Sequence, residues 1–155
     1  MCIRDRNKSD IDKPYKVGYI AGVFDLFHIG HLNMFKRAKE QCRYLIVGVV
    51  SDEGVRLNKQ AEPFVPFDER IEMVRSCKYV DEAIKLPLDF CGTRDMFKIY
   101  HFDVQFSGSD YEHDPAWLAE KEFLEKNGST MVFFPYTQST SSTKLKKAIE
   151  NRINN

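Results

Sequence analysis

Apolar and polar positions along the chain follow two periods in turn, and this alternation predicts strands and helices in sequence. Short continuous apolar runs, which are typical of buried strands, lie at 17–21, 44–50, 83–86, 104–107 and 130–134. Apolar residues at helical spacing fall between and after them, at 32–42, 52–57, 67–78, 95–100, 116–127 and 145–153. The alternation indicates an α/β fold, which we predict to be a single Rossmann-like, doubly wound domain with about five parallel strands and helices on both faces of the sheet.

The most informative segment follows the first predicted strand and reads Gly22-Val23-Phe24-Asp25-Leu26-Phe27-His28-Ile29-Gly30-His31. It is typical of a strand that turns into a phosphate-binding loop, because Gly22 allows a ligand to approach the backbone and Gly30 lies where helical periodicity begins. His28 and His31 would then sit at the N-terminal end of a helix and face one anion. Histidines three apart also share a helix face and could ligate a metal, so the pair by itself leaves both interpretations open.

Composition narrows the class of protein. The 155 residues are enough for one domain with a hydrophobic core. The 23 acidic and 23 basic residues balance, which argues against nucleic acid as a partner. The sequence has no apolar run as long as a membrane span and no segment typical of a signal peptide, so we expect a cytoplasmic location. The cysteines show no Cys-x-x-Cys spacing and are interpreted as thiols.

The first residues of the chain do not look like part of the domain. Met1-Cys2-Ile3-Arg4-Asp5-Arg6 resembles the translation of a transposon-end adapter from a sequencing library, and the residues at 7–13 are mostly polar. We therefore expect residues 1–15 to form a disordered or non-native segment and the domain to span residues 16–153.

Four further segments follow the histidine pair: Ser51-Asp52-Glu53, Val65-Pro66-Phe67-Asp68-Glu69-Arg70, Lys78-Tyr79-Val80-Asp81-Glu82 and Tyr136-Thr137-Gln138-Ser139-Thr140-Ser141-Ser142-Thr143. With the Gly-x-Phe-Asp turn and the His-x-Gly-His segment, they resemble the nucleotidylyltransferase superfamily, and within it the cytidylyltransferases related to glycerol-3-phosphate and choline-phosphate cytidylyltransferase. The resemblance runs from about residue 16 to residue 149. It implies a reaction in which a phosphate oxygen of an acceptor attacks the α-phosphorus of CTP and pyrophosphate leaves.

The resemblance also implies the co-substrates. CTP and a phosphorylated alcohol, with glycerol 3-phosphate or a related polyol phosphate as the leading acceptor, would be the partners, and Mg²⁺ would neutralise the triphosphate as a cofactor. An adenylyltransferase that uses ATP and a sugar phosphate is an alternative, because that branch shares the His-x-Gly-His segment. The family is often dimeric, but core packing explains the many aromatic residues equally well, so a homodimer stays open.

Individual residues receive roles from the same resemblance. His28 and His31 would contact the triphosphate and donate hydrogen bonds or a proton, and replacing His28 by Ala should lower turnover by orders of magnitude with the melting temperature nearly unchanged. Lys59 would be catalytic and would bind the acceptor together with Lys78. The remaining nucleotide contacts would be Gly22, Val23, Phe24, Asp25, Gly30, Arg70, Asp110, Tyr136, Thr137, Ser139, Thr140, Ser141, Ser142 and Thr143. No residue is assigned to a metal, and Lys144, Lys146 and Lys147 are interpreted as a solvated helix face.

Differences from the family pattern leave open whether the protein catalyses the reaction. A family lysine is replaced by Ala61, an arginine is replaced by Lys78, and the family's Arg-Thr-Glu-Gly becomes Tyr136-Thr137-Gln138-Ser139. Lys78 keeps the charge but loses the bidentate geometry of arginine. A non-catalytic nucleotide-binding relic is therefore a further alternative, and a metal-binding module built on His28 and His31 is a weaker one.

Overall fold

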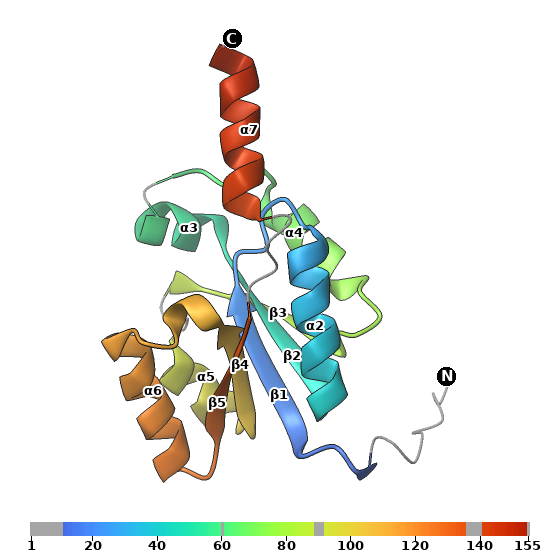
Figure 1. Ribbon diagram of the computed structural model, residues 1–155, viewed down its shortest axis with the longest axis vertical. Helices are drawn as coiled ribbons and strands as arrows, with labels where there is room; N and C mark the ends of the chain where they lie inside the picture. The colour runs from blue at the N-terminus through green and yellow to red at the C-terminus, as the bar shows by residue number, and fades with distance from the viewer. Residues whose placement is uncertain (1–10, 60, 89–91, 136–140, 155) are drawn as a thin grey trace.

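The computed structural model describes residues 11–59, 61–88, 92–135 and 141–154. Its strands are β1 (Tyr15–Gly22), β2 (Cys42–Val50), β3 (Glu82–Leu86), β4 (Val104–Gly108) and β5 (Thr130–Phe134). Its helices are α2 (Ile29–Gln41), α3 (Asp52–Lys59), α4 (Phe67–Arg75), α5 (Thr93–Tyr100), α6 (Pro115–Lys126) and α7 (Ser142–Asn154), with a 3₁₀ turn, η2 (Ser109–Tyr111), after β4. Strands and helices alternate as the sequence pattern predicts (Figure 1).

The strands form one five-stranded parallel sheet in the order β3-β2-β1-β4-β5. The chain winds outward from β1 through β2 to β3, then returns to the other side of β1 for β4 and β5 (Figure 1). The carboxyl ends of β1 and β4 therefore mark the point where the strand order reverses, which is where doubly wound sheets bind ligands. This topology confirms the predicted fold class.

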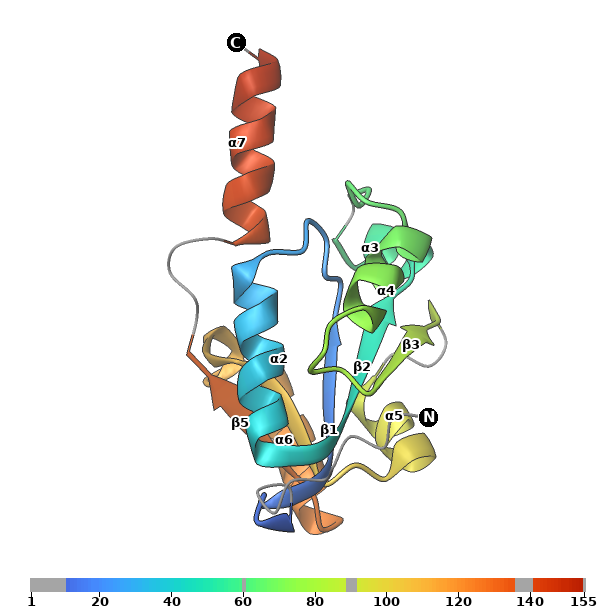
Figure 2. The same ribbon diagram turned by 90° about the vertical axis from the view of Figure 1, so that its right-hand side faces the viewer.

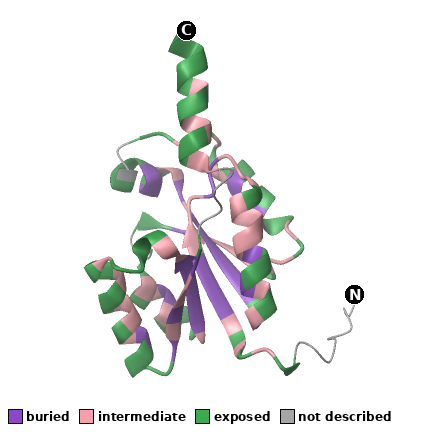
Figure 3. Cartoon of the chain, viewed as in Figure 1, coloured by how far each residue is buried: buried purple, intermediate pink, exposed green. Residues whose placement is uncertain are grey.

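Each face of the sheet has its own apolar core. Successive strand residues point to opposite faces, so Ile20 packs in a cluster with Phe35 of α2 and Val74 of α4, whereas Tyr19 packs in a cluster with Leu124 of α6. Figure 3 shows the buried residues concentrated in the central strands between these two layers. The two cores hold the strand ends, and the loops that follow them, in fixed positions.

Two boundaries differ from the sequence predictions. α4 ends at Arg75, so Lys78 lies in the connection to β3 and not on the helix. Near the start of the chain, the carbonyl of Ile11 accepts a hydrogen bond from Arg43 at 2.8 Å, and Tyr15 already belongs to β1. β1 therefore begins one residue before the expected start of the domain, and residues 1–10 lie outside the described residues.

α7 extends away from the layered body of the domain, and its first turn lies near the start of α2 (Figures 1 and 2). The sequence predicts an apolar stripe of Leu145, Ile149 and Ile153 on this helix. None of the α7 residues that the structure describes is buried, and Ile153 is 75% exposed. The stripe is therefore not a core face. In the described residues no helix is long and apolar enough to cross a membrane.

Candidate functional site

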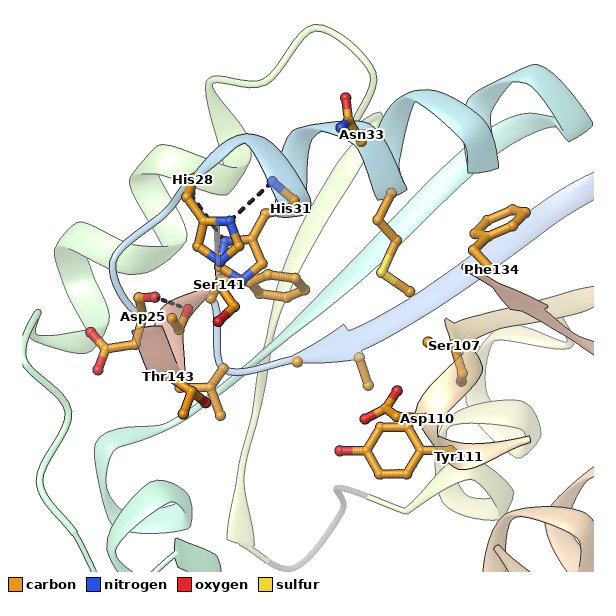
Figure 4. Close-up of a pocket in the computed structure, with 18 of the residues that line it drawn as sticks. Asp25, His28, His31, Asn33, Ser107, Asp110, Tyr111, Phe134, Ser141 and Thr143 are labelled. Atoms are coloured by element: carbon orange, nitrogen blue, oxygen red, sulfur yellow. Dashed lines mark hydrogen bonds between the residues drawn. The ribbon is translucent and has the colours of Figure 1, made fainter. Parts of the chain in front are cut away.

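A cavity of about 280 Å³ opens at the carboxyl ends of β1 and β4. Its wall comes from the loop after β1 and the first turns of α2, from the end of β4 and η2, and from the start of α7. The sequence-predicted residues that it brings together are Gly22, Val23, Phe24, Asp25, His28, Gly30, His31, Asp110, Ser141, Ser142 and Thr143. Figure 4 shows the histidines and Asp110 on opposite sides of the end of β1.

His28 and His31 build the first turn of α2 as well as the cavity wall. His28 is the N-cap residue, and its Nδ1 accepts a hydrogen bond from the Gly30 amide at 3.0 Å. The His28 amide in turn donates to Nδ1 of His31 at 3.2 Å, which completes a capping box made of two imidazoles. The two rings lie side by side with centroids 3.9 Å apart. The capping bonds therefore fix the orientation of both rings.

Both imidazoles are neutral near pH 7. Burial lowers the pKa of His28 below its usual 6.5. Burial and the neighbouring His28 lower the pKa of His31 to about 3, and the Asp25 carboxylate offsets this in part. A neutral imidazole carries one ring proton, and because Nδ1 of each ring accepts a bond, the proton belongs on Nε2. The pair can donate two hydrogen bonds to an anion, but in this state neither ring holds the extra proton that a proton donor would need.

The loop between β1 and α2 is strained. Phe24 and Leu26 have φ angles of 56° and 53°, in the left-handed region that costs a non-glycine residue roughly 1–2 kcal/mol. The Phe24 ring holds the turn by packing against His31 and Phe35, with centroid distances of 5.3 and 5.2 Å. A Cβ atom on Gly22 would lie 2.7 Å from the Phe24 ring. This packing explains why position 22 needs a glycine. The reason is separate from the close approach of a ligand that the sequence suggested.

Asp25 joins three segments at the cavity wall. Its carboxylate accepts the amides of Phe64 at 2.8 Å and Val65 at 3.0 Å and pairs with the Lys146 ammonium of α7 at 2.8 Å. The backbone carbonyl of Asp25 accepts the Ser142 hydroxyl at 2.7 Å. Burial alone would raise the pKa of Asp25, but Lys146 and the two amides outweigh it and lower the pKa. The residue thus anchors α7 to the loop that carries the histidines.

Arg70 does not line this cavity, contrary to its expected contact with the nucleotide. Its guanidinium is buried and donates to the carbonyls of Val65, Val23 and Val50 at 2.7–2.8 Å, and it pairs with Asp52 at 2.6 Å. It borders a separate, mainly apolar cavity of about 340 Å³ on the other side of Phe24. In this structure Arg70 ties together the loops after β1 and β2 and the entry to α4.

The serine- and threonine-rich segment is described from Ser141 onward. The Ser141 hydroxyl accepts the Lys144 amide at 3.1 Å and so caps α7, while the Ser142 hydroxyl is bonded to Asp25. Both residues and Thr143 line the cavity. The other predicted contacts of this segment, Tyr136, Thr137, Ser139 and Thr140, lie outside the described residues.

The structure describes the two lysines that were predicted to bind the acceptor to different extents. Lys59 ends α3, and its side chain is outside the described part of the chain. Lys78 is exposed and precedes the start of β3, where the Asp81 amide bonds to Leu45 near the start of β2. The sheet is parallel, so Lys78 lies at its amino-terminal edge, opposite the cavity. The structure therefore does not bring Lys78 to this cavity.

Sequence reasoning missed several residues of the wall. Asn33, Met34 and Arg37 continue the face of α2 that begins at Gly30, and Lys146 lies one turn after Ser142 on α7. The residues on α2 and the lysine on α7 could each have been found from helical spacing. Two further residues, Tyr111 of η2 and Trp117 of α6, stack with ring centroids 4.5 Å apart and form an aromatic wall. No local pattern marks that wall, because it depends on how α6 packs.

The carboxylates that line the cavity suit a metal ion that binds together with the ligand. They suit less well a metal ion that the protein holds without a ligand. The structure shows, in the part of the chain it describes, no group of three or more His, Cys, Asp or Glu side chains that could hold a metal ion. Asp25 is bonded to Lys146, and Asp110 lies exposed in another part of the wall. Mg²⁺ typically takes one or two carboxylates and completes its shell with phosphate oxygens and water. Asp110 meets that requirement.

The topology and this cavity define an α/β domain of the doubly wound class with a cavity at its switch point, where folds of this class bind ligands. Residues 19–148 match the family described as Cytidylyltransferase-like, and the chain belongs to this family of nucleotidyltransferases.

The relatives of this chain include enzymes that are named for different reactions. The FAD synthase of Thermococcus kodakarensis is 37% identical over 86% of this chain and 89% of that protein. The ethanolamine-phosphate cytidylyltransferase of Dictyostelium discoideum is 41% identical over 89% of this chain, but the match spans 39% of that protein. The glycerol-3-phosphate cytidylyltransferase of Bacillus subtilis is 32% identical over 83% of this chain and 92% of that protein.

A solved structure agrees with the fold. The lipopolysaccharide core biosynthesis protein from Thermoplasma volcanium superposes with a TM-score of 0.64 at 25% identity, covering 81% of this chain and 99% of that chain. Nucleotidyl transfer is therefore the class of reaction to which the family and the relatives point, and the nucleotide and acceptor are separate questions.

Proposed function

We propose that this protein transfers CMP from CTP to a phosphorylated alcohol, glycerol 3-phosphate or a related polyol phosphate, and releases pyrophosphate. The observation that carries the proposal is the meeting of the first turns of α2 and α7 at one cavity, where His28 and His31 each have an Nε2 proton to donate. Helix N-termini and oriented neutral donors suit a triphosphate. The two cytidylyltransferase relatives support CTP as the nucleotide.

In the proposed reaction a phosphate oxygen of the acceptor forms a bond to the α-phosphorus of CTP, and the bond from that phosphorus to pyrophosphate breaks. No covalent enzyme intermediate is needed, so the protein aligns the reactants and stabilises negative charge. The Nε2 protons of His28 and His31 would donate to phosphate oxygens. Asp110 is the residue that would help to hold Mg²⁺, and the ion would supply neutralisation of charge on the phosphates. Lys59 is proposed to contact the acceptor phosphate from the end of α3.

Adenylyl transfer from ATP is the second candidate. The specific observation in its favour is the FAD synthase relative, which matches 89% of its own length. The stacked pair of Tyr111 and Trp117 does not choose between the nucleotides, because every base has a face that can stack on an aromatic ring. The acceptor would then be a sugar phosphate or a flavin phosphate.

Pyrophosphate release tests both candidates at once. The assay compares CTP with ATP in the presence of Mg²⁺, across glycerol 3-phosphate, other polyol phosphates, phosphocholine, phosphoethanolamine, sugar 1-phosphates and riboflavin phosphate. Release with CTP and a polyol phosphate, lost in a His28→Asn variant, is the expected result. Release with ATP alone would move the protein to the second candidate. Binding of CTP without release from any acceptor would favour a nucleotide-binding relic.

A further inference from the structure

The second cavity, behind the histidine loop, shares a wall with the first. Its lining is apolar except for Arg70, and Met73 of that lining is 52% exposed, so solvent reaches it. Phe24 lines both the second cavity and the cavity of the histidines. The two cavities therefore lie on opposite sides of one layer of side chains, and this layer separates water in the second cavity from His31.

Phe27 contributes a second aromatic ring to this layer. It is half-buried and lines the second cavity, and its ring centroid lies 5.4 Å from that of His31 and 5.9 Å from that of Phe35 in the core. The Phe24 ring contacts the same imidazole at 5.3 Å. Two phenyl rings that line the second cavity are therefore in contact with the His31 ring.

The hydrogen bond that orients His31 requires a neutral ring. Nδ1 of His31 accepts the His28 amide at 3.2 Å, and a protonated imidazole has no nitrogen that can accept. Burial is the main cause that lowers the pKa of His31 to about 3. Water that entered from the second cavity would favour the charged ring and so break the capping bond.

The charged and titratable groups around His31 have smaller effects than burial. His28 lowers the pKa of His31, and the Asp25 carboxylate raises it. Lys146 of α7 pairs with Asp25, and Arg70 of α4 pairs with a carboxylate of its own on the far side of the phenyl layer. A substitution in the layer changes none of these groups, so its effect on His31 reports the access of water.

We infer that Phe27 is a positioning residue of this site, which closes the second cavity off from His31 and so keeps the His31 ring neutral and hydrogen-bonded to the His28 amide. The inference deepens the proposed function and rests on it for the ligand, because the oriented ring would present its Nε2 proton to a phosphate oxygen. Phe27 itself touches no reacting atom and acts through His31.

The test is a pH titration by NMR with isotope-labelled histidine, which reports the charge of each ring and the nitrogen that carries its proton. Phe27→Ala opens the layer, Phe27→Leu keeps an apolar side chain there, and Phe97→Ala removes a half-buried phenyl ring from the other core, where it also contacts a histidine, as a matched control. Phe27→Ala should raise the measured pKa of His31 by at least about 1, and the other two variants should titrate like the wild type. Turnover of Phe27→Ala should also fall more steeply than that of the wild type between about pH 7.5 and about pH 5.

Several outcomes would overturn the inference. They are an unchanged titration of His31 in Phe27→Ala, an equal rise in Phe97→Ala, and a wild type in which His31 already takes up its proton near its ordinary pKa of 6.5. If Phe27→Ala does not fold, Phe27→Gln takes its place, because its polar amide also admits water to the layer, and the same rise is expected.

The proposed function is judged separately, by pyrophosphate release from the wild type. A raised pKa of His31 in Phe27→Ala without any release by the wild type would support the role of Phe27 in the layer and reject the proposed function. Release by the wild type together with an unchanged titration in Phe27→Ala would reject the inference and leave the proposed function standing.

Discussion

His28 and His31 share one turn of helix in such a way that each ring has a structural side and a free side. The amide of His28 donates to Nδ1 of His31 at 3.2 Å, while Nδ1 of His28 accepts the Gly30 amide at 3.0 Å. The Nδ1 atoms therefore cap α2, and the Nε2 atoms are left as donors. A substitution at either position removes both properties unless it is chosen to keep one of them.

His28→Asn and His28→Ala should separate these two properties. Asn is a favourable N-cap residue, so His28→Asn should keep the stability of the wild type, whereas His28→Ala should lose about 0.5–2 kcal/mol of unfolding free energy. Both variants lack the Nε2 donor and should lose turnover by roughly 10²–10³-fold, as for other preorganised hydrogen-bond donors to developing negative charge. Urea unfolding and initial rates of pyrophosphate release measure the two effects. The structure thus revises the expectation that His28→Ala leaves the melting temperature nearly unchanged.

Two outcomes would contradict this division of roles. Wild-type turnover in His28→Asn would show that the ring proton is not used in the reaction. Equal stability of the Asn and Ala variants would show that the cap contributes nothing measurable to α2.

Arg70→Met should act mainly on stability. The substitution leaves three backbone carbonyls and the partly exposed carboxylate of Asp52 without the guanidinium that joins them, and loss of a hydrogen bond to a charged group costs about 1.5–3 kcal/mol. Arg70→Lys should recover part of this loss, because an ammonium cannot reach all the acceptors of a planar guanidinium. Urea unfolding gives the measurement. If the variant keeps the stability of the wild type but binds CTP more weakly, the result would instead support the nucleotide contact that the sequence suggested.

The sequence contained a sign of this burial. Arg70 lies three residues after Phe67 and four before Val74, so it falls on the stripe of α4 that faces the core. A motif match identifies the residue type, whereas helical spacing indicates its direction. The same reasoning applies to Lys146, which shares a face of α7 with Ser142. The fold was predictable because strand and helix periods alternate clearly, but the Asp25–Lys146 pair joins residues far apart in sequence and had no local pattern to mark it.

Lys78→Ala should leave both turnover and the Michaelis constant of the acceptor unchanged. Lys78 lies at the amino-terminal edge of the sheet, where its ammonium lies 5.2 Å from the Tyr79 ring. The expected change in unfolding free energy is within about 1 kcal/mol, as for other exposed cation–π pairs. Steady-state kinetics with the acceptor identified by pyrophosphate release would show this. A raised Michaelis constant for the acceptor would mean that Lys78 reaches a site in another copy of the chain.

The stability of the folded domain should fall as the pH drops below 6.5, in a way that depends on His31. Above pH 6.5 the ring is neutral in both the folded and the unfolded chain, so it contributes no pH dependence. Below that value the unfolded chain takes up a proton at its ordinary pKa of 6.5, whereas the folded chain does so at about 3. Between these values the unfolded state binds more protons, and this one group should reduce the unfolding free energy by up to about 1.4 kcal/mol per pH unit.

A His31→Asn variant isolates that effect, because its side-chain oxygen can still accept the His28 amide and it does not titrate in this range. The carboxylates, including Asp25, titrate in both proteins and cancel in the comparison. Urea unfolding of the two proteins between about pH 7 and about pH 4.5 should therefore show the wild type losing stability faster than the variant as the pH falls. Parallel curves would mean that His31 takes up its proton equally well in the folded state, and that the neutral pair of donors assigned to this site does not persist at mildly acidic pH.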